Sequence, residues 1–193
     1  MNLVFATNNP NKLLEVQAQL PLTIQLSDLK SIGCTEDIVE DAPTIEGNAL
    51  IKARHVFQNY GKNCFADDTG LLVSALNGEP GVYSARYAGP NGDSEKNMAK
   101  LLKNLKGRPS RSAHFKTVVA LIIDGNEYLF DGLCQGEITE KPSGDKGFGY
   151  DPIFKPYGYD VTFAEMSISE KGAISHRGLA IKKLIHFLSD ISE

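Results

Sequence analysis

The chain has 193 residues, a hydrophobic fraction of 41%, a charged fraction of 23% and a formal net charge of −4. This length and composition suit one domain over residues 1–193, with two lobes around a cleft, that buries a core without disulfides or a structural metal. The acidic balance argues against nonspecific binding to DNA or RNA, which requires a basic face, but it permits a nucleotide substrate.

The three cysteines, Cys34, Cys64 and Cys134, are far apart, and no CxxC pair is present. The sequence therefore indicates neither a disulfide framework nor a zinc site, and we predict buried thiols in a reducing compartment. The N-terminus lacks the basic start and the apolar run of a signal peptide, and the longest apolar stretch, residues 118–123, is too short to span a membrane. We expect a cytoplasmic protein without a membrane partner.

The first elements in chain order are a strand and two helices. A short apolar run at residues 3–6 predicts a buried strand. Asn9 and Pro10 then predict the N-cap and the first position of a helix, where the missing N–H of proline costs nothing. Apolar residues at helical spacing predict a second helix that begins near Thr44 and stops at Gly61.

The middle of the chain begins with a second short strand, predicted over residues 64–66, which ends at Asp67-Asp68-Thr69-Gly70. Residues 77–93 are rich in Gly, Pro and Asn and predict a long loop. A third helix is predicted over residues 94–105, with leucines and a methionine on its inward face.

The last third predicts a hairpin and a final helix. Apolar runs at residues 114–123 and 127–134 flank Asp124-Gly125-Asn126, which is a strong hairpin signal. A helix is predicted over residues 176–191. Strands and helices mix, and one pair of strands is antiparallel, so we predict an α/β fold with a mixed sheet flanked by helices.

The first candidate functional segment lies between the first strand and the first helix. It consists of Thr7, Asn8, Asn9, Pro10, Asn11 and Lys12. Backbone N–H groups at a helix start favour an anion, and Lys12 adds a mobile positive charge, so the segment is a candidate phosphate cradle. The spaced glycines of the P-loop are absent, and an ordinary capped turn with a surface lysine is the structural alternative.

Asp67 and Asp68 form the second candidate site. Adjacent carboxylates at the end of a buried strand repel each other, and a hard cation with oxygen ligands would resolve this repulsion. One of the carboxylates could take a proton from water. Glu40 is a candidate ligand from another segment, and a pair of turn aspartates is the structural alternative.

Two glycine-rich or cationic segments complete the candidates. Residues 147–154 place Phe148 between two glycines, which suits stacking on a flat ligand, while Phe154 is expected in the core. Lys171, His176 and Arg177 gather positive charge near the start of the final helix, where an anionic or acceptor-rich ligand would compensate them. The alternatives are a packed turn for the first segment and a salt-bridged surface cluster for the second.

Five ordered motifs closely resemble the inosine triphosphate pyrophosphatase family, the bacterial-type dITP/XTP pyrophosphatases, over essentially the whole chain. They are Thr7-x-Asn9-x-x-Lys12, residues 66–71 (ADDTGL), residues 80–87 (PGVYSARY), residues 147–154 (GFGYDPIF) and Ile174-Ser175-His176-Arg177-Gly178-x-Ala180. The resemblance implies a long, twisted mixed sheet with two lobes and a central cleft, a homodimer, and Mg²⁺-dependent hydrolysis of ITP, dITP and XTP to the monophosphate and pyrophosphate.

The resemblance also implies residue roles. Residues 7–12 would hold the triphosphate, and Asp68 would accept a proton and bind Mg²⁺ with support from Asp67 and Glu40. The remaining substrate contacts would come from Thr69, Phe148, Gly149, Tyr150, Asp151, Lys171, His176 and Arg177. Thr69 stands where the family usually has Ser, Asn8 where it often has Gly, and the segment around Glu40 reads differently from the family pattern.

Two other functions compete with this interpretation. A pyrophosphatase of the Maf type would act on modified pyrimidines, but Phe148 and the Ser175-His176-Arg177 run favour a purine. A nucleotide-sensing module without catalysis would need the cradle and the ring but not Asp67-Asp68. A purely structural protein would explain neither the glycines nor the clustered charges.

Overall fold

The computed structural model describes residues 1–191, and the contacts between its residues divide the chain into two compact units. Unit 1 comprises Met1–Asp68, Thr117–Gly132 and the chain from His176 onward, and unit 2 comprises Thr69–Lys116 and Leu133–Ser175. Three strands contribute residues to both units: β3 (Cys64–Val73), β5 (Ser112–Ile123) and β6 (Asn126–Ile138). Hydrogen bonds join the strands in the order β2-β1-β3-β5-β6-β7, with β4 paired to β3.

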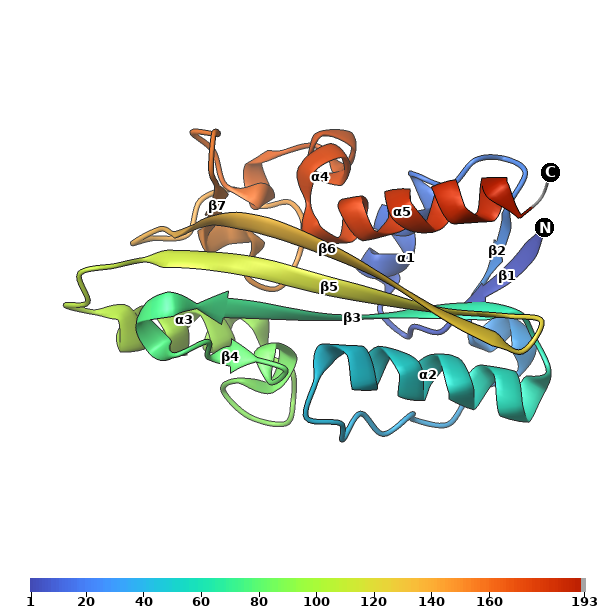
Figure 1. Ribbon diagram of the computed structural model, residues 1–193. Helices are drawn as coiled ribbons and strands as arrows, with labels where there is room; N and C mark the ends of the chain where they lie inside the picture. Colours follow the sequence, from blue (N-terminus) through green and yellow to red (C-terminus); the bar gives the residue numbers. More distant parts are fainter. Residues whose placement is uncertain (192–193) are drawn as a thin grey trace. The chain divides into compact units, whose positions relative to one another are not determined.

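Unit 1 is a sheet covered by helices on both faces. Strand β1 (Asn2–Phe5) pairs in parallel with β2 (Gln25–Ser27) and with the start of β3. Helices α1 (Pro10–Gln17) and α5 (His176–Asp190) lie on one face, and α2 (Ile45–Tyr60) lies on the other (Figure 1). Apolar side chains of β1, β3, β5, α1 and α5 form the core of this unit, in which the rings of Phe5 and Phe65 stack with centroids 4.6 Å apart.

The predicted ends of the first two helices are confirmed. Asn9 Oδ1 accepts hydrogen bonds from the backbone N–H groups of Asn11 and Lys12, at 2.9 and 3.3 Å. Thr44 Oγ1 accepts one from Gly47 N at 3.0 Å, and Gly61 ends α2 in the left-handed conformation, with φ of 59°.

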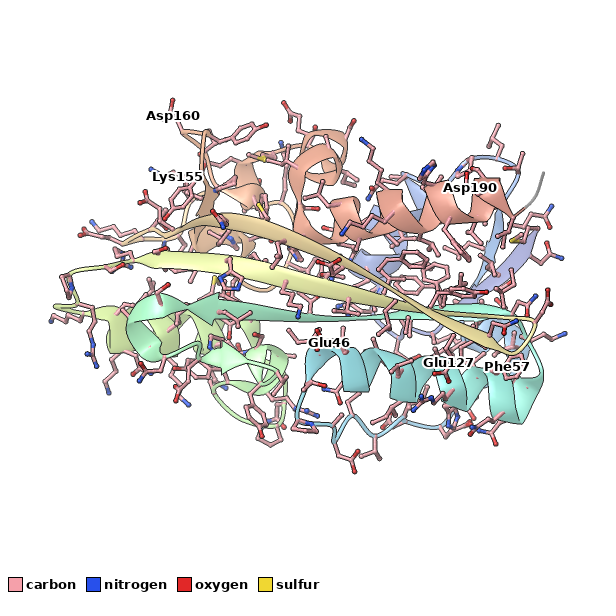
Figure 2. All side chains as sticks on the ribbon, viewed as in Figure 1. Glu46, Phe57, Glu127, Lys155, Asp160 and Asp190 are labelled. Carbon is pink, nitrogen blue, oxygen red and sulfur yellow. The ribbon has the colours of Figure 1, made fainter. Side chains whose placement is uncertain are left out.

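Helix α2 is also tied to the hairpin of unit 1. Arg54 donates from Nε and Nη2 to the two carboxylate oxygens of Glu127, each at 2.7 Å, and Figure 2 shows Glu127 beside the helix. The hairpin turn itself confirms the sequence signal. Asp124 and Gly125 both have positive φ, 50° and 81°, as a tight two-residue turn between twisted strands requires.

Unit 2 holds the other halves of the shared strands. Strand β4 (Pro80–Gly81) pairs antiparallel with the end of β3, and β7 (Phe154–Pro156) pairs antiparallel with the end of β6. Helices α3 (Ser94–Leu105) and α4 (Ile168–Ile174) belong to this unit. Its core contains the clustered rings of Phe115, Phe154 and Phe163, so the expected core position of Phe154 is confirmed.

The structure differs from the sequence-based prediction in several places, and strands β2 and β7 are among the elements that were not predicted. Strand β3 does not end at Asp67 but continues to Val73, because its second half pairs with β4. The predicted loop over residues 77–93 contains β4 and a 3₁₀ turn, Ser84–Arg86. Both hairpin strands are longer than predicted, and α4 was not predicted.

Two other expectations can be compared with the described residues. All three cysteines are free and buried, as predicted. Among residues 1–191, no helix combines the length and the apolar character that crossing a membrane requires.

Candidate active site

The segment from Thr7 to Lys12 connects β1 to α1. Thr7 Oγ1 accepts a hydrogen bond from Asn9 N at 3.1 Å, and the Asn9 side chain caps the helix, so both polar side chains shape the turn. Asn8, Pro10 and Asn11 are exposed. The side chain of Lys12 is 14% exposed and points to the carboxylate of Asp67 on strand β3.

Asp67 is the centre of a buried charge network in unit 1. Its Oδ1 lies 2.9 Å from Lys12 Nζ, and its Oδ2 lies 2.8 Å from Arg177 Nε. Arg177 in turn places Nη1 2.6 Å from Glu15 Oε2. Asp67 and Arg177 are 1% and 2% exposed, and two cations face two carboxylates, so each buried charge has a partner.

The network shifts the pKa of its members in directions that the geometry explains. Burial opposes ionisation of Asp67, but Lys12 and Arg177 outweigh it and hold the pKa of this carboxyl below its ordinary value. Burial, with the positive charges of Lys52 and Arg177, lowers the pKa of Lys12 despite the pairing with Asp67. The lowered pKa keeps the Asp67 carboxylate ionised at neutral pH, where it pairs with Lys12 of the candidate phosphate cradle.

A second group of charges in unit 1 surrounds Lys52 on α2. Lys52 Nζ lies 2.7 Å from Glu40 Oε2 and 3.9 Å from Asp68 Oδ1. Asn48, one helical turn earlier, donates to Asp68 Oδ2 at 3.3 Å and accepts a hydrogen bond from Ala42 N at 2.9 Å. These contacts bring the segment that carries Glu40 and the strand that carries Asp68 to the same helix.

The arrangement of Glu40 and Asp68 fits a cation. The two carboxylates already converge on a positive charge, the Lys52 ammonium, and their oxygens are the ligand type that Mg²⁺ prefers. Asp67 fits less well, because Lys12 and Arg177 engage its two oxygens. Within residues 1–191, the carboxylates of Glu40, Asp67 and Asp68 do not form a trio with ligand atoms within 4.8 Å of one another. Asp68 and Glu40 are therefore the better-placed candidates, and the assignment of all three residues as metal ligands stays a prediction.

Unit 2 contains the Phe148 segment. Phe148 N donates to Asp151 Oδ2 at 2.8 Å, and Lys171 Nζ lies 2.5 Å from the same oxygen and 5.1 Å from the centre of the Phe148 ring. Gly147 has φ of 71°, and a Cβ there would collide with the Asp151 carboxylate. Gly147 thus makes room for the Asp151 carboxylate, and Asp151 orients its basic neighbour Lys171.

Several of the predicted site residues also have contacts within the protein. Tyr150 is buried and donates its hydroxyl hydrogen bond to Ser84 O at 2.8 Å, which is a structural role. Lys171 was grouped with His176 and Arg177, but it pairs with Asp151 in unit 2, whereas the other two begin α5 in unit 1. Lys171, His176 and Arg177 are all buried. Carboxylates of the protein itself compensate the charges of Lys171 and Arg177.

The remaining predicted residues fall in both units. Thr69 and Gly149 belong to unit 2, where Thr69 is half-buried and a Cβ at Gly149 would meet open space. His176 is buried in unit 1.

Sequence reasoning missed Glu15, Asn48 and Lys52. Lys52 lies between apolar positions of the buried face of α2, and a polar residue on such a face is the signal that could have found it. Glu15 lies three positions after Lys12 on α1, but its link to Arg177 crosses 162 positions and has no local signal.

The sequence model of the Ham1 family matches residues 3–187 of the chain. The chain belongs to the Ham1 family. A dITP/XTP pyrophosphatase of Flavobacterium johnsoniae is 56% identical over 98% of both chains, and one of Porphyromonas gingivalis is 50% identical over 96% of both. The structure of a HAM1 protein from Coxiella burnetii superposes with a TM-score of 0.90 at 39% identity, covering 98% of this chain and 99% of the other.

A second solved structure carries a name for its activity. The nucleoside-triphosphatase, or dITP/XTP pyrophosphatase, of Mycobacterium abscessus has a TM-score of 0.77 and 42% identity, covering 96% of the Ham1 chain described here and 99% of its own. The mixed α/β fold predicted from the sequence is confirmed by these structures. The Ham1 matches also support a nucleotide pyrophosphatase among the functions considered above.

Proposed function

We propose that this Ham1 protein hydrolyses the triphosphates of non-standard purines, ITP, dITP and XTP, to the monophosphate and pyrophosphate, which removes deaminated purines from the nucleotide pool. The names of its relatives support this substrate class. The observation that carries the proposal is the convergence of Glu40 and Asp68 on Lys52, beside the buried Lys12–Asp67–Arg177 network. Carboxylates and ammonium groups arranged in this way suit a phosphoanhydride and its counterion.

Mg²⁺ belongs to the proposal as the counterion of the triphosphate. Asp68 and Glu40 would hold it, and it would neutralise charge on the phosphate oxygens. Lys52 already supplies positive charge at these carboxylates, and Lys12, whose side chain is partly exposed, would bind a phosphate oxygen.

In the proposed reaction, Asp68 accepts a proton from a water molecule that attacks the α-phosphorus. The new P–O bond forms as the bond to the pyrophosphate oxygen breaks, and Lys12 stabilises the negative charge on the leaving pyrophosphate. Asp67 does not touch the substrate in this scheme. It is a positioning residue that holds Lys12 and Arg177.

The Phe148 ring would stack on the purine, and Lys171 and Asp151 hold this segment in place. Selectivity for a 6-keto purine needs a hydrogen-bond donor. Arg177 forms ion pairs with Asp67 and Glu15. Of the two candidate donors, His176 is therefore the better one. An adenine amino group would face this donor unpaired, at a cost of about 1–3 kcal/mol, which corresponds to roughly 10–100-fold discrimination.

The proposal is tested by a panel of nucleoside triphosphates, including modified pyrimidines, assayed for pyrophosphate with and without Mg²⁺. We expect turnover of ITP, dITP and XTP that EDTA abolishes. Preference for modified pyrimidines would favour the Maf-type function, and nucleotide binding without pyrophosphate would favour a sensing module.

Asp68→Asn tests the proposed proton acceptor. We expect this variant to bind ITP and to lose turnover, because an amide cannot accept the proton of the attacking water. Rapid-quench measurement of pyrophosphate gives the turnover, and calorimetric titration with ITP gives the binding. A variant that keeps wild-type turnover would remove Asp68 from this role.

We also propose that the protein is a homodimer, as its family resemblance implies. Light scattering on the eluting peak of a size-exclusion column gives the molar mass that decides this. A mass of 21.0 kDa, the mass of one chain, would contradict it.

A further inference from the structure

A group of three different metal-binding side chains lies in unit 1, outside the residues assigned to the reaction. Cys34, Glu36 and His55 offer a thiol, a carboxylate and an imidazole, and one ligand atom of each lies within 4.8 Å of the other two. Among residues 1–191, these three form the one such group of cysteine, histidine and acidic side chains. We infer that they bind a borderline-soft divalent ion of the zinc class.

The local chain brings these residues together. Gly33, with φ of 78°, reverses the chain after a short 3₁₀ turn, and Cys34 N then donates to Leu29 O at 3.0 Å. Cys34 is consequently buried, with 2% of its surface exposed. Two residues later, Glu36 Oε1 lies 2.8 Å from His55 Nε2 on helix α2.

The donor set determines the class of ion. Thiolate, imidazole and carboxylate are the three ligand types of tetrahedral zinc sites, and three protein ligands leave the fourth position for water. A thiol that gives up its proton on binding the ion and the carboxylate would together balance a charge of two. A hard ion such as Mg²⁺ would instead prefer the all-oxygen pair Glu40 and Asp68.

Neighbouring side chains orient two of the three ligands. Asn59 Nδ2 lies 3.3 Å from His55 Nδ1, so the ring is held from its far side while Nε2 faces Glu36. Tyr60 donates its hydroxyl hydrogen bond to Glu36 Oε1 at 2.9 Å. Outer contacts of this kind fix ring orientation in metal sites.

Access and charge also suit an ion. The side chains of His55 and Glu36 are 25% and 46% exposed, so an ion can enter from solvent while Cys34 closes the inner side. The partly exposed Glu36 carboxylate supplies negative charge at the position that the ion would take.

Hydrogen bonds join Glu36 to His55 and Tyr60, and the Cys34 thiol interacts with Tyr60 and Glu36 as well, so the three ligand side chains are already turned toward one another. A cysteine packed only for its volume has no need of a carboxylate and an imidazole as neighbours. A bound ion would clamp residues 34–36 to α2, the helix that also carries Asn48 and Lys52.

Cobalt tests the inference, because a thiolate bound to Co²⁺ gives a charge-transfer band and a tetrahedral site gives intense visible bands. Metal-free wild-type protein is titrated with Co²⁺ in excess Mg²⁺, which occupies the oxygen site. We expect both bands to saturate at one equivalent and to disappear when Zn²⁺ is added. Absence of the charge-transfer band in the wild type would overturn the inference.

Three variants assign the ligands. Cys34→Ser should lose the charge-transfer band, and His55→Gln should weaken Co²⁺ binding by 10-fold or more. Cys134→Ser, which removes a buried thiol outside the group, should keep the wild-type spectrum. Zn²⁺ should raise the melting temperature of the wild type and of Cys134→Ser but not of His55→Gln. A charge-transfer band that survives in Cys34→Ser, or a Zn²⁺ shift that survives in His55→Gln, would refute the assignment.

Discussion

At the scale of single residues, Asp67 binds two cations of the candidate site, Lys12 and Arg177, whereas the sequence predicted only that it supports Asp68. The sequence suggested that two adjacent aspartates repel each other unless a metal intervenes. In the structure they alternate along β3, and Asp67 faces Lys12 and Arg177 while Asp68 faces Asn48 and Lys52. The repulsion is resolved mainly by cations of the protein itself.

The residue types of the site could be predicted from the sequence, but their pairing could not. The cradle, the aspartates and the Phe148 segment each have a local pattern. The hydrogen bond from Arg177 to Asp67 joins residues 110 positions apart, and the sequence around either residue does not predict its partner. The Cys34, Glu36 and His55 group was missed for the same reason, because His55 comes 19 positions after Glu36 and no CxxC pair marks the group.

Asp67→Ala should destabilise the protein strongly. It leaves Lys12 and Arg177 buried with one carboxylate fewer, and breaking a buried ion pair from one side costs about 3–5 kcal/mol. Urea unfolding followed by circular dichroism measures the change. Glu137→Ala is the matched control, since its pair with Lys155 is partly exposed and worth about 0–1 kcal/mol. Similar losses in the two variants would contradict the central role of Asp67.

Glu40→Gln should raise the Mg²⁺ concentration needed for half-maximal turnover by roughly 10-fold or more, because one of two charged ligands becomes a neutral amide. The rate at saturating Mg²⁺ should change less. Asp41→Asn removes the exposed neighbouring carboxylate and should leave the Mg²⁺ dependence unchanged. If Asp41→Asn has the larger effect on the Mg²⁺ dependence, the ligand is Asp41 and not Glu40.

At the scale of elements, the parts with local signals were predicted well. The Asn9 and Thr44 caps and the Asp124-Gly125 turn depend on residues only a few positions apart. Strand β3 was predicted too short because its second half is defined by pairing with β4, a partner brought by the later chain. Helix α4 has only seven residues, and its buried side chain is a lysine, Lys171, so it has little apolar periodicity.

The contact between β6 and α5 gives a prediction at this scale. A Cβ at Gly132 would overlap the carbonyl oxygen of His176 and would lie 2.7 Å from Ala180 N. Gly132→Ala must therefore push back the first turn of α5, which carries His176 and Arg177. We expect a loss of about 1–3 kcal/mol, as for other overpacked sites, together with reduced turnover of ITP.

Chemical denaturation and steady-state kinetics on the same preparation measure both effects. Leu133→Ala, at the next position of β6, removes an exposed side chain and should change stability by less than about 1 kcal/mol. Wild-type stability in Gly132→Ala would show that the helix start is free to move.

At the scale of the whole molecule, each unit has its own apolar core and its own charged group. The three strands that pass through both units join these cores covalently. An apolar run predicted the buried strand at residues 3–6, and Phe154 was expected in the core, but the sequence did not predict the boundaries of the units. These boundaries lie between Asp68 and Thr69, between Lys116 and Thr117, and between Gly132 and Leu133, at positions where β3, β5 and β6 each continue without a break.

Acid stability is a property of the whole molecule that follows from its carboxylates. A hydrogen bond from the backbone N–H of Thr162, with hydrogen bonds to the side chains of Ser143 and Thr162, lowers the pKa of Glu165, and hydrogen bonds to Ser167 lower that of Glu170. A carboxyl with a lowered folded-state pKa contributes stability above its unfolded pKa, about 4.3 for Glu, and loses that contribution as pH falls through the folded value. We expect the free energy of unfolding to fall steadily below about pH 5, as the unfolded chain takes up protons first.

The double variant Glu165→Gln, Glu170→Gln isolates two of these groups. Glutamine can still reach back to the N–H groups of Thr162 and Ser167, which the glutamates contact at 2.8 Å, but it does not titrate. The unfolding free energy of the variant should therefore decline less between pH 5 and pH 3 than that of the wild type, whatever the offset at pH 7. Urea melts at a series of pH values measure both curves, with the exposed Glu140→Gln as the control for a change of charge alone. If the unfolding free energies of wild type and double variant decline in parallel with pH, protonation of Glu165 and Glu170 does not affect folding.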